Sequence, residues 1–328
     1  MIKVILAEQI HLGEIKKLIT KTNFKPYRYL LREVPDERLV DYLYNQILQT
    51  LTDKSSVTYI ACVEDMVVGL ATMKNLEWDT DIFGIKMANI AHLIADDSAI
   101  TTEVIKGKLI TAICQHCIKI GIKHLSCRVY TNDINSIHAL EQKHFRLMDT
   151  ILNHAFDFRK YPIKEFIPQY IIRPAQEGDD KEIAEVSRLA FSNYFSRFHI
   201  DNMLSRKAAT NLYIRWAENV CHDYADTVFV AQSENRIVGF SAWKKAGMAE
   251  ESIGIRVGTS SICAILPDQS GKGICKALTL EGMLWGKGKV DIIEGGTHIN
   301  NSPVQRVLTE LSWQVLDSWH TFRIWFPK

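Results

Sequence analysis

Two stretches of the chain show the same succession of apolar and polar positions. Residues 58–71 read TYIACVEDMVVGLA, and residues 228–241, which lie 170 positions later, read VFVAQSENRIVGFS. In each, an apolar run, a short polar interruption and a second apolar run predict a β-hairpin. The two stretches carry identical residues at Ala61/Ala231, Glu64/Glu234, Val68/Val238 and Gly69/Gly239.

Two further blocks repeat in the same order. Residues 90–98 align with 262–270 at an offset of 172, and residues 132–158 align with 300–326 at an offset of 168. Near-constant spacing over three blocks predicts an internal duplication. We therefore expect one domain over residues 1–160, a proline-containing linker over 161–169 and a second domain over 170–328, each of an ordinary domain size.

Helix signals alternate with the predicted strands. Asp179 and Asp180 precede the periodic run KEIAEVSRLAF, and Asn301, Ser302 and Pro303 precede VQRVLTEL, with the proline just inside the helix start. A strand restarts at 170–173, after the linker. Strands and helices mix throughout both halves, so we expect an α/β class, or α+β, with a mixed sheet.

Composition excludes several classes of function. The net charge is +1 over 328 residues, which argues against a nucleic-acid partner or an anionic membrane surface. No apolar run reaches the roughly 18 residues of a membrane span, and the N-terminus does not resemble a signal peptide, so we expect a cytoplasmic protein. The seven cysteines do not form a disulfide framework. The CxxC of Cys114 and Cys117 lies in a helical pattern without a second pair, and we expect no metal site.

The segment 261–284 carries the clearest chemistry. An apolar strand ends at Leu266 and Pro267, a turn with Gly271 and Gly273 follows, and a helical pattern begins at Ile274. Glycines between a strand and a helix let backbone N–H groups converge on an anion such as a pyrophosphate. The spacing fits neither a P-loop nor a dinucleotide fingerprint. A plain structural turn is the alternative.

This segment resembles the acyl-CoA loop of the GCN5-related N-acetyltransferases, whose usual form is [QR]-x-x-G-x-[GA]. Ser270 stands at the Gln/Arg position and Cys275 at the second Gly/Ala position. The resemblance implies acyl-CoA as co-substrate, held mainly by backbone amides. The residues that it assigns to CoA are Ile265, Ser270, Gly271, Lys272, Gly273, Ile274, Cys275, Lys276 and Asn301. The N-terminal counterpart of the loop, residues 96–101, has two acids and no glycine, which predicts that the N-terminal copy does not bind CoA.

Two shorter motifs resemble nucleotide-sugar N-acyltransferases, namely dTDP-fucosamine acetyltransferase and the N-acyltransferases of dTDP-3-amino-3,6-dideoxyhexoses. The motifs are SRFHIDNM at 196–203 and LEWDTDIFG at 76–84. They imply acceptor contacts from Arg197 by phosphate pairing and from Phe198 by stacking. The other implied acceptor residues are His199, Trp216, Trp78 and Phe83. Packing in a core or between domains is the alternative for the aromatic residues.

The resemblance implies that the acceptor amine attacks the thioester directly. The resemblance assigns the oxyanion contact to a backbone N–H of Ile265 or its neighbour, and a pantetheine contact to Asn301, which is equally suited to cap a helix. Leu308 stands where relatives place a tyrosine acid. We therefore expect catalysis by positioning, with water or His298 taking the proton.

The leading hypothesis is acylation of a dTDP-linked amino-deoxysugar, with a 3-amino-3,6-dideoxyhexose favoured and acetyl or 3-hydroxybutyryl as the acyl group. A second hypothesis is acylation of another small amine such as an aminoglycoside, which needs an acidic pocket instead of a basic one. The third is a binding module without catalysis. The oligomeric state stays open.

Overall fold

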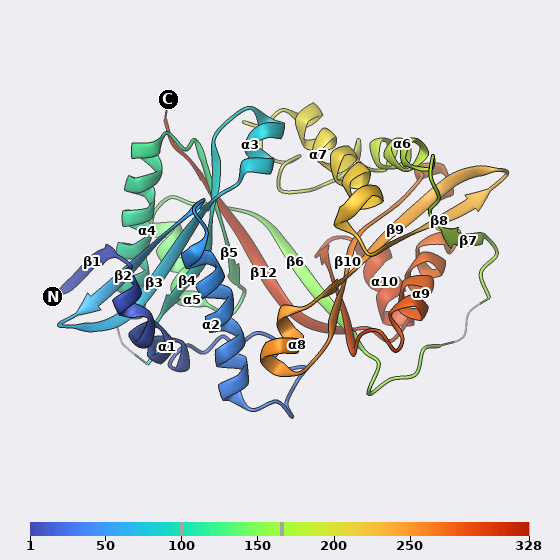
Figure 1. Cartoon of the computed structure of the whole chain (residues 1–328). Coiled ribbons are helices and arrows are strands. Elements are labelled where there is room, and N and C mark those ends of the chain that lie inside the picture. The colour runs from blue at the N-terminus through green and yellow to red at the C-terminus, as the bar shows by residue number, and fades with distance from the viewer. Residues whose placement is uncertain (99–100, 165–166, 328) are drawn as a thin grey trace. The chain divides into compact units, whose positions relative to one another are not determined.

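The computed structural model describes residues 1–98, 101–164 and 167–327. The chain forms two compact units. Unit 1 contains Met1–Thr150 and Ser318–Lys328, and unit 2 contains Ile151–Asp317. Each unit is described by itself, with element labels as in Figure 1.

Unit 1 is built on a six-stranded mixed sheet with the order β1-β2-β3-β4-β5-β12. All neighbouring strands are antiparallel except β4 and β5, which run parallel. Its elements are β1 (Ile2–Leu6), η1 (Gln9–His11), α1 (Leu12–Thr20), α2 (Asp36–Thr52), β2 (Ser56–Val63), β3 (Met66–Asn75), α3 (Glu77–Phe83), β4 (Met87–Ala95), α4 (Thr102–Ile120), β5 (His124–Tyr130), α5 (Ile134–Gln142) and the start of β6 (Arg146–Asp157).

Unit 2 repeats this plan with the order β6-β11-β10-β9-β8-β7, in which β10 and β11 are the parallel pair. Its elements are β7 (Ile171–Pro174), α6 (Asp180–Phe191), α7 (Arg206–Asn219), the π-helical turn η2 (Val220–Tyr224), β8 (Thr227–Ser233), β9 (Arg236–Ala246), α8 (Met248–Ile253), β10 (Val257–Ile265), η3 (Pro267–Gln269), α9 (Ile274–Gly286), β11 (Ile292–His298), α10 (Ser302–Glu310) and the start of β12 (Gln314–Trp325). The α/β class with mixed sheets is confirmed.

The repeated segments match down to single backbone conformations. Both predicted hairpins form, as β2–β3 and β8–β9. The turn residues Glu64 and Glu234 both adopt the left-handed conformation, with φ of 53° and 50°. Gly84 and Gly254 end α3 and α8 with φ of 67° and 71°. Such positions are costly for most residues, and their recurrence at one offset supports the duplication.

The units differ from the predicted halves in their last strands. Residues 151–157 of β6, from the N-terminal half of the sequence, pair with β11 in unit 2. Residues 319–325 of β12, from the C-terminal half, pair with β5 in unit 1. A boundary at residues 161–169 would instead keep β6 in the first domain and β12 in the second. The two strand segments belong to the aligned blocks and share one apolar pattern, so the pattern does not say which sheet each one joins.

Helices cover both faces of the sheet in unit 2. Trp243 of β9 is 1% exposed, and a Cβ on Gly282 of α9 would lie 1.9 Å from its ring, so α9 packs on the Trp243 face. Helix α10 contacts α9, whereas α6 contacts α7 and the sheet (Figure 1). The core of unit 2 lies on both sides of β9 and β10. The predicted loop directly precedes α9 and therefore lies on the Trp243 face of the sheet.

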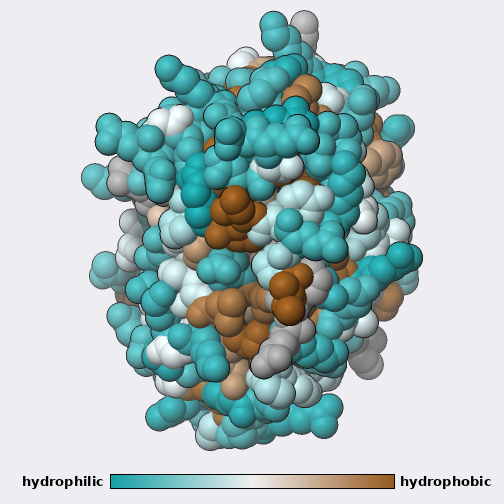
Figure 2. All heavy atoms as spheres, turned by 90° about the vertical axis from the view of Figure 1, so that its right-hand side faces the viewer, coloured by the Kyte–Doolittle hydropathy of each residue, from teal (hydrophilic) through white to brown (hydrophobic). Residues whose placement is uncertain are grey.

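The surface of unit 2 is largely polar on the side that bears β7. Figure 2 shows hydrophilic atoms over most of this face, with apolar atoms gathered in a few patches. Exposed apolar side chains near β7 are Ile167 and Ile171. Within the described residues no helix is long and apolar enough to cross a bilayer.

Candidate active site

Strands β10 and β11 of unit 2 separate partway along their length. Their parallel ladder joins Val257–Thr259 to Ile292–Glu294 and ends there. Beyond it β10 continues to Ile265 and β11 to His298, so a V-shaped opening lies between two strands of one sheet. A β-bulge between Ser260 and Ile262 turns β10 at the start of this opening.

The opening exposes a row of backbone donors. Leu266 donates its N–H to Val238 of β9 at 2.9 Å. N–H groups alternate between the two edges of a strand, so Cys263 and Ile265 direct theirs toward the side of β11, where the ladder has ended. Donors aimed into such an opening suit the amides of a pantetheine arm or a developing oxyanion. Ile265 stays the predicted oxyanion donor, and the register adds Cys263 as a neighbour with the same orientation.

The predicted loop follows β10 directly. The short η3 helix ends at Gln269, Gly271 has φ of 77°, and Gly273 has φ of 82° as the residue preceding α9. Gly273 has no side chain to cap the first N–H groups of α9, and that turn contains no acid. A Cβ at Gly271 would meet nothing within 4 Å. The loop thus leaves donors and space where a pyrophosphate is predicted to bind.

The two lysines of the loop have different surroundings. Lys272 is exposed and its Nζ donates to Gln269 Oε1 at 3.0 Å. Lys276 forms an ion pair with Glu310 of α10 at 2.9 Å. Ser270 is exposed, and Ile274 is buried at 1% exposure beneath the helix start. Lys272 is therefore better placed than Lys276 to meet an outlying phosphate.

The end of β11 and the start of α10 hold two predicted catalytic residues. Asn301 precedes α10 but makes no side-chain cap; its Nδ2 donates to Thr297 Oγ1 at 2.9 Å. His298 is 6% exposed, and its Nδ1 accepts the N–H of Asn300 at 3.0 Å. The neutral ring therefore carries its hydrogen on Nε2. This arrangement makes His298 a hydrogen-bond donor at Nε2, and to take a proton it has to give up the bond to Asn300.

Phe195 is a neighbour of His298 that the sequence did not single out. Its side chain is 55% exposed, and its ring meets the His298 ring edge to face with centroids 5.4 Å apart. An exposed aromatic ring beside a buried histidine offers an apolar surface to a bound molecule. The sequence feature that could have indicated Phe195 is the aromatic-rich stretch 194–198. The motif SRFHIDNM includes Phe198 of this stretch but not Phe195.

The predicted acceptor residues of unit 2 fall into two groups. Phe198 is 7% exposed and packs in the protein, while Arg197 lies over its ring at 4.5 Å from the centroid. His199 is 9% exposed, and its ring nitrogens contact Ser196 at 2.8 Å and Thr210 at 3.2 Å. The half-buried Trp216 packs against the main hydrophobic core of unit 2. Among the described residues no carboxylate pairs with Arg197, which keeps it the best placed of the four for an anion.

The remaining predicted acceptor residues belong to unit 1. Trp78 and Phe83 lie in α3, where Trp78 is 37% exposed and Phe83 is half-buried. Helix α3 corresponds by position to α8 of unit 2. Their role toward an acceptor stays a prediction.

In unit 1 the two acids of the segment that corresponds to the CoA loop are bound by neighbouring residues. Asp96 pairs with Lys21 at 3.0 Å, and Asp97 accepts the N–H of Asn23 at 2.7 Å. Burial opposes ionisation of Asp96, but hydrogen bonds from Ser98 and Lys21 outweigh it and lower its pKa. Ala99 and Ile100 of this loop lie outside the described residues. Carboxylates fixed in this segment disfavour the binding of an anion such as a pyrophosphate there.

A buried ion pair and an aromatic cluster occupy the rest of the corresponding region in unit 1. Lys106 of α4 is 2% exposed and its Nζ lies 2.8 Å from Asp133, the residue that caps α5. Phe24, Tyr130 and Trp319 form an aromatic cluster, with Phe24 and Trp319 centroids 5.1 Å apart. Tyr130 ends β5, as His298 ends β11. Large side chains thus lie where unit 2 has its predicted catalytic residues.

The environment of the two CxxC cysteines disfavours their thiolate forms. Cys114 and Cys117 both lie in α4, as the sequence predicts. Burial raises the pKa of Cys114 to about 11 and that of Cys117 to about 12. No cluster of metal-binding side chains occurs within the described residues.

Solved structures share this architecture over the full chain. A GCN5-related N-acetyltransferase from Sphaerobacter thermophilus superposes with a TM-score of 0.65 at 13% identity, covering 99% of this chain and 95% of its own. The fold is that of the GCN5-related N-acetyltransferases. A tandem protein of this fold from the clavulanic acid biosynthesis pathway matches over 100% of both chains with a TM-score of 0.60 at 9% identity. A glucosamine N-acetyltransferase region of a fungal β-N-acetylglucosaminidase matches 99% of this chain and 38% of its own, with a TM-score of 0.64 at 12% identity.

One curated relative is similar in sequence. It is the spore coat polysaccharide biosynthesis protein SpsD of Bacillus subtilis (strain 168), which is 24% identical over 207 residues, or 61% of this chain. The matched region spans 66% of that relative, just under two thirds of its length. No protein-family model matches the chain.

Proposed function

We propose that the protein is an acyl-CoA-dependent N-acyltransferase whose donor site is formed by unit 2. The observation that carries the proposal is the V-shaped opening between β10 and β11, which leads to an uncapped helix start flanked by Gly271 and Gly273. Backbone donors of β10 suit the pantetheine arm and the oxyanion, and the start of α9 suits the pyrophosphate. The corresponding segment of unit 1 has two acids and no glycine in its sequence, so one donor site per chain is expected.

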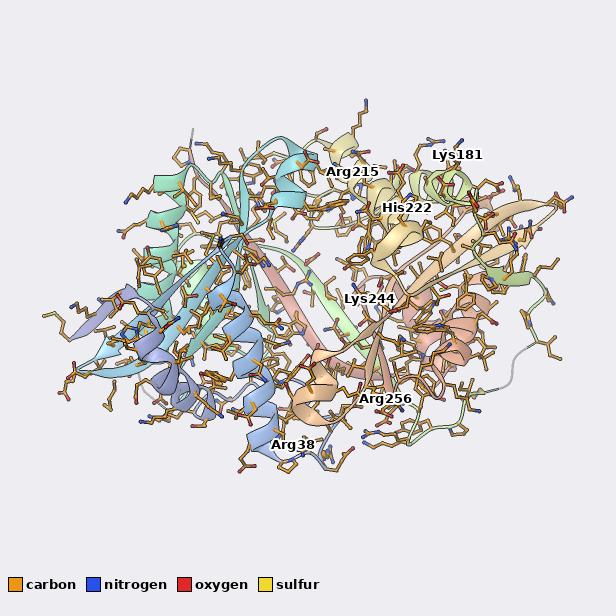
Figure 3. The ribbon with its side chains drawn as sticks, viewed as in Figure 1. Arg38, Lys181, Arg215, His222, Lys244 and Arg256 are labelled. Atoms are coloured by element: carbon orange, nitrogen blue, oxygen red, sulfur yellow. The ribbon has the colours of Figure 1, made fainter. Side chains whose placement is uncertain are left out.

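We further propose that the acceptor is a dTDP-linked amino-deoxysugar, with a 3-amino-3,6-dideoxyhexose favoured. Its amine attacks the thioester carbonyl directly, and Arg197 pairs with a phosphate of the nucleotide. The cationic or titratable side chains that Figure 3 labels on unit 2 are Lys181 of α6, Arg215 of α7, His222 of η2, Lys244 of β9 and Arg256, which precedes β10. Cationic side chains attract an anionic acceptor and repel a polycationic aminoglycoside. The similarity to a spore coat polysaccharide biosynthesis protein also supports an acceptor from surface polysaccharide synthesis.

The test is mass spectrometry of reactions that combine two donors with two classes of acceptor. The donors are acetyl-CoA and 3-hydroxybutyryl-CoA, and the acceptors are 3-amino and 4-amino dTDP-deoxysugars. We expect an acylated dTDP-sugar from at least one pair. An aminoglycoside, incubated in parallel, should remain unmodified.

The outcomes separate the two parts of the proposal. Binding of CoA without any acylated dTDP-sugar would overturn the acceptor and leave the donor site standing. Absence of CoA binding, measured by calorimetry, would overturn the donor site itself. An Arg197→Ala variant should raise the KM for the sugar and leave the CoA Kd unchanged, with Arg188→Ala as the control because Arg188 already pairs with Glu185 on the surface of α6.

A further inference from the structure

Two cysteines flank the predicted CoA loop. Cys263 lies in β10 and Cys275 in the first turn of α9, so the chain between them contains Gly271, Lys272 and Gly273. Both thiols are free and both residues are partly buried. The resemblance to the acyl-CoA loop puts Cys275 at the position of a small residue and assigns no role to Cys263.

Strand register places Cys263 under the start of α9. Cys263 pairs with Ser241, whose hydroxyl donates to the carbonyl of Leu278 in α9. Two residues on, and thus on the same face of β10, the side chain of Ile265 lies beside Gly239. A Cβ on Gly239 would be 3.2 Å from Ile265 and 3.2 Å from Ile274, the first residue of α9. The strand and the helix are therefore in close contact where the two cysteines stand.

Cys263 and Cys275 are neighbouring thiols at the junction of β10 and α9, and each affects the pKa of the other. Cys263 acts as the hydrogen-bond donor toward the side chain of Cys275. The hydroxyl of Thr279 donates to the backbone carbonyl of Cys275 at 2.8 Å. Received hydrogen bonds stabilise a thiolate, and the first turn of a helix adds the positive end of the backbone dipole. The bond from Cys263 accordingly lowers the pKa of Cys275, while the same bond and burial raise that of Cys263. Cys275 is therefore suited to react with an oxidant, and Cys263 is placed to attack the oxidised sulfur of Cys275.

We propose that Cys263 and Cys275 form a disulfide on exposure to a peroxide, and that this bond weakens acyl-CoA binding by tightening the loop that they flank. The Cys275 thiolate attacks one oxygen of the peroxide, breaking the O–O bond to give a sulfenic acid and, after protonation, water. The Cys263 thiol then loses its proton, its sulfur attacks the Cys275 sulfur, and hydroxide leaves as a second water. Peroxide is reduced and the two thiols are oxidised, with no other reactant.

The structural consequence follows from bond length. Disulfide sulfurs lie about 2.0 Å apart, closer than the sulfurs of a hydrogen-bonded pair. Forming the bond pulls the start of α9 toward β10 and shortens the span available to Gly271–Gly273. The N–H of Cys263, which faces the opening between β10 and β11, moves with it. The effect on CoA rests on the proposed donor site, whereas disulfide formation does not.

The test treats the full-length protein with hydrogen peroxide and follows it by mass spectrometry and calorimetry. We expect loss of both thiol hydrogens, a peptide cross-link between Cys263 and Cys275, and a CoA Kd that rises about tenfold and recovers with dithiothreitol. Within each variant the ratio of oxidised to reduced Kd is compared. That ratio should stay near one in Cys263→Ser and near the wild-type value in Cys221→Ser, since burial raises the pKa of Cys221 to about 11.

Three results overturn the inference or part of it. Oxidation of Cys275 to a sulfinic or sulfonic acid without a cross-link would show that the disulfide does not form. A cross-link with an unchanged CoA Kd would show that the disulfide does not affect CoA binding. If the reduced protein does not bind CoA at all, the donor site fails while the mass-spectrometric result still decides the disulfide.

Discussion

At the scale of single residues, the backbone N–H of Ile265 is open to a direct test. Replacing Ile265 by proline removes this donor, and because the N–H faces the opening and not β9, the ladder to β9 is kept. We expect the rate of acyl transfer to fall by about 100- to 1000-fold, as for loss of an oxyanion donor. Rates are measured by thiol release from acetyl-CoA in the presence of the acceptor.

The control for this substitution is the next residue back. The N–H of Ala264 points toward β9, so Ala264→Pro should break the sheet and lower the melting temperature strongly. A folded Ile265→Pro protein with the wild-type rate would show that this N–H does not stabilise the reaction.

Gly271 permits a second residue-scale prediction. Its φ of 77° strains any residue with a side chain, although a Cβ there would find open space. We expect Gly271→Ala to lower the free energy of unfolding by about 1 kcal/mol and to weaken CoA binding by about tenfold, because the Cβ enters the space meant for the anion. Gly288→Ala is the matched control, with φ of 80° and equal space. It should lose similar stability and bind CoA as the wild type does, which denaturant titration and calorimetry can separate.

His298 is a case in which sequence and structure differ in what they suggest. Its spacing before Asn301 fits a proton acceptor, but Nδ1 already accepts the N–H of Asn300. An asparagine at this position can offer its side-chain oxygen to the same N–H and cannot take a proton. If His298 collects the proton, His298→Asn should lose rate and flatten the rate profile between about pH 6 and about pH 9. A profile that keeps its wild-type shape would assign His298 to positioning.

At the scale of elements, Asp157 stabilises the end of strand β6. Its carboxylate is 1% exposed and bonds to Arg159 through both oxygens, at 2.9 and 2.7 Å. Burial alone raises the pKa of this group, but the bonds from Arg159 outweigh burial and lower it. A lowered folded pKa stabilises the protein above the unfolded value of about 3.9, and this contribution is lost as pH falls through the folded pKa.

Asp157→Asn should therefore reduce the free energy of unfolding at neutral pH by about 2 kcal/mol and weaken its decline below about pH 4. Thermal unfolding at several pH values measures both effects. Asp268→Asn serves as control, since Asp268 is exposed and pairs with Arg236 on the surface, and it should change little. Equal acid sensitivity of Asp157→Asn and the wild type would contradict the assignment.

Elements were predictable where local pattern decides them. The hairpins β2–β3 and β8–β9 follow from alternation and a polar turn, and α6 and α10 begin where their start signals lie. The site was less predictable because side chains of one short segment diverge: Arg197 and Phe198 are adjacent, yet the phenylalanine is buried while Phe195 is exposed. Which aromatic residue faces the site depends on packing against His298, which no local pattern contains.

At the scale of the whole molecule, the exchanged strands mark the limit of sequence pattern. The segments 151–157 and 319–325 align with each other and carry the same alternation, so either could complete either sheet. The outcome depends on long-range pairing and not on local propensity. The domain boundary at 161–169 is therefore a prediction about sequence repeats, while the compact units follow the pairing.

The duplication also predicts how many donor molecules one chain binds. Both units keep a parallel strand pair that separates, β4–β5 and β10–β11, so two openings exist. Only unit 2 adds glycines before a helix whose first turn contains no acid, whereas α4 of unit 1 has Glu103 in its first turn, and Asp96 and Asp97 are held in place by Lys21 and Asn23. Anion binding requires free donors, and at this place in unit 1 the acids Asp96 and Asp97 already occupy the nearby lysines Lys21 and Lys106. Calorimetry with CoA should therefore give about one site per chain, and Asp97→Asn should leave that number unchanged. Two sites, or one that survives Gly271→Ala at full affinity, would place donor binding in unit 1.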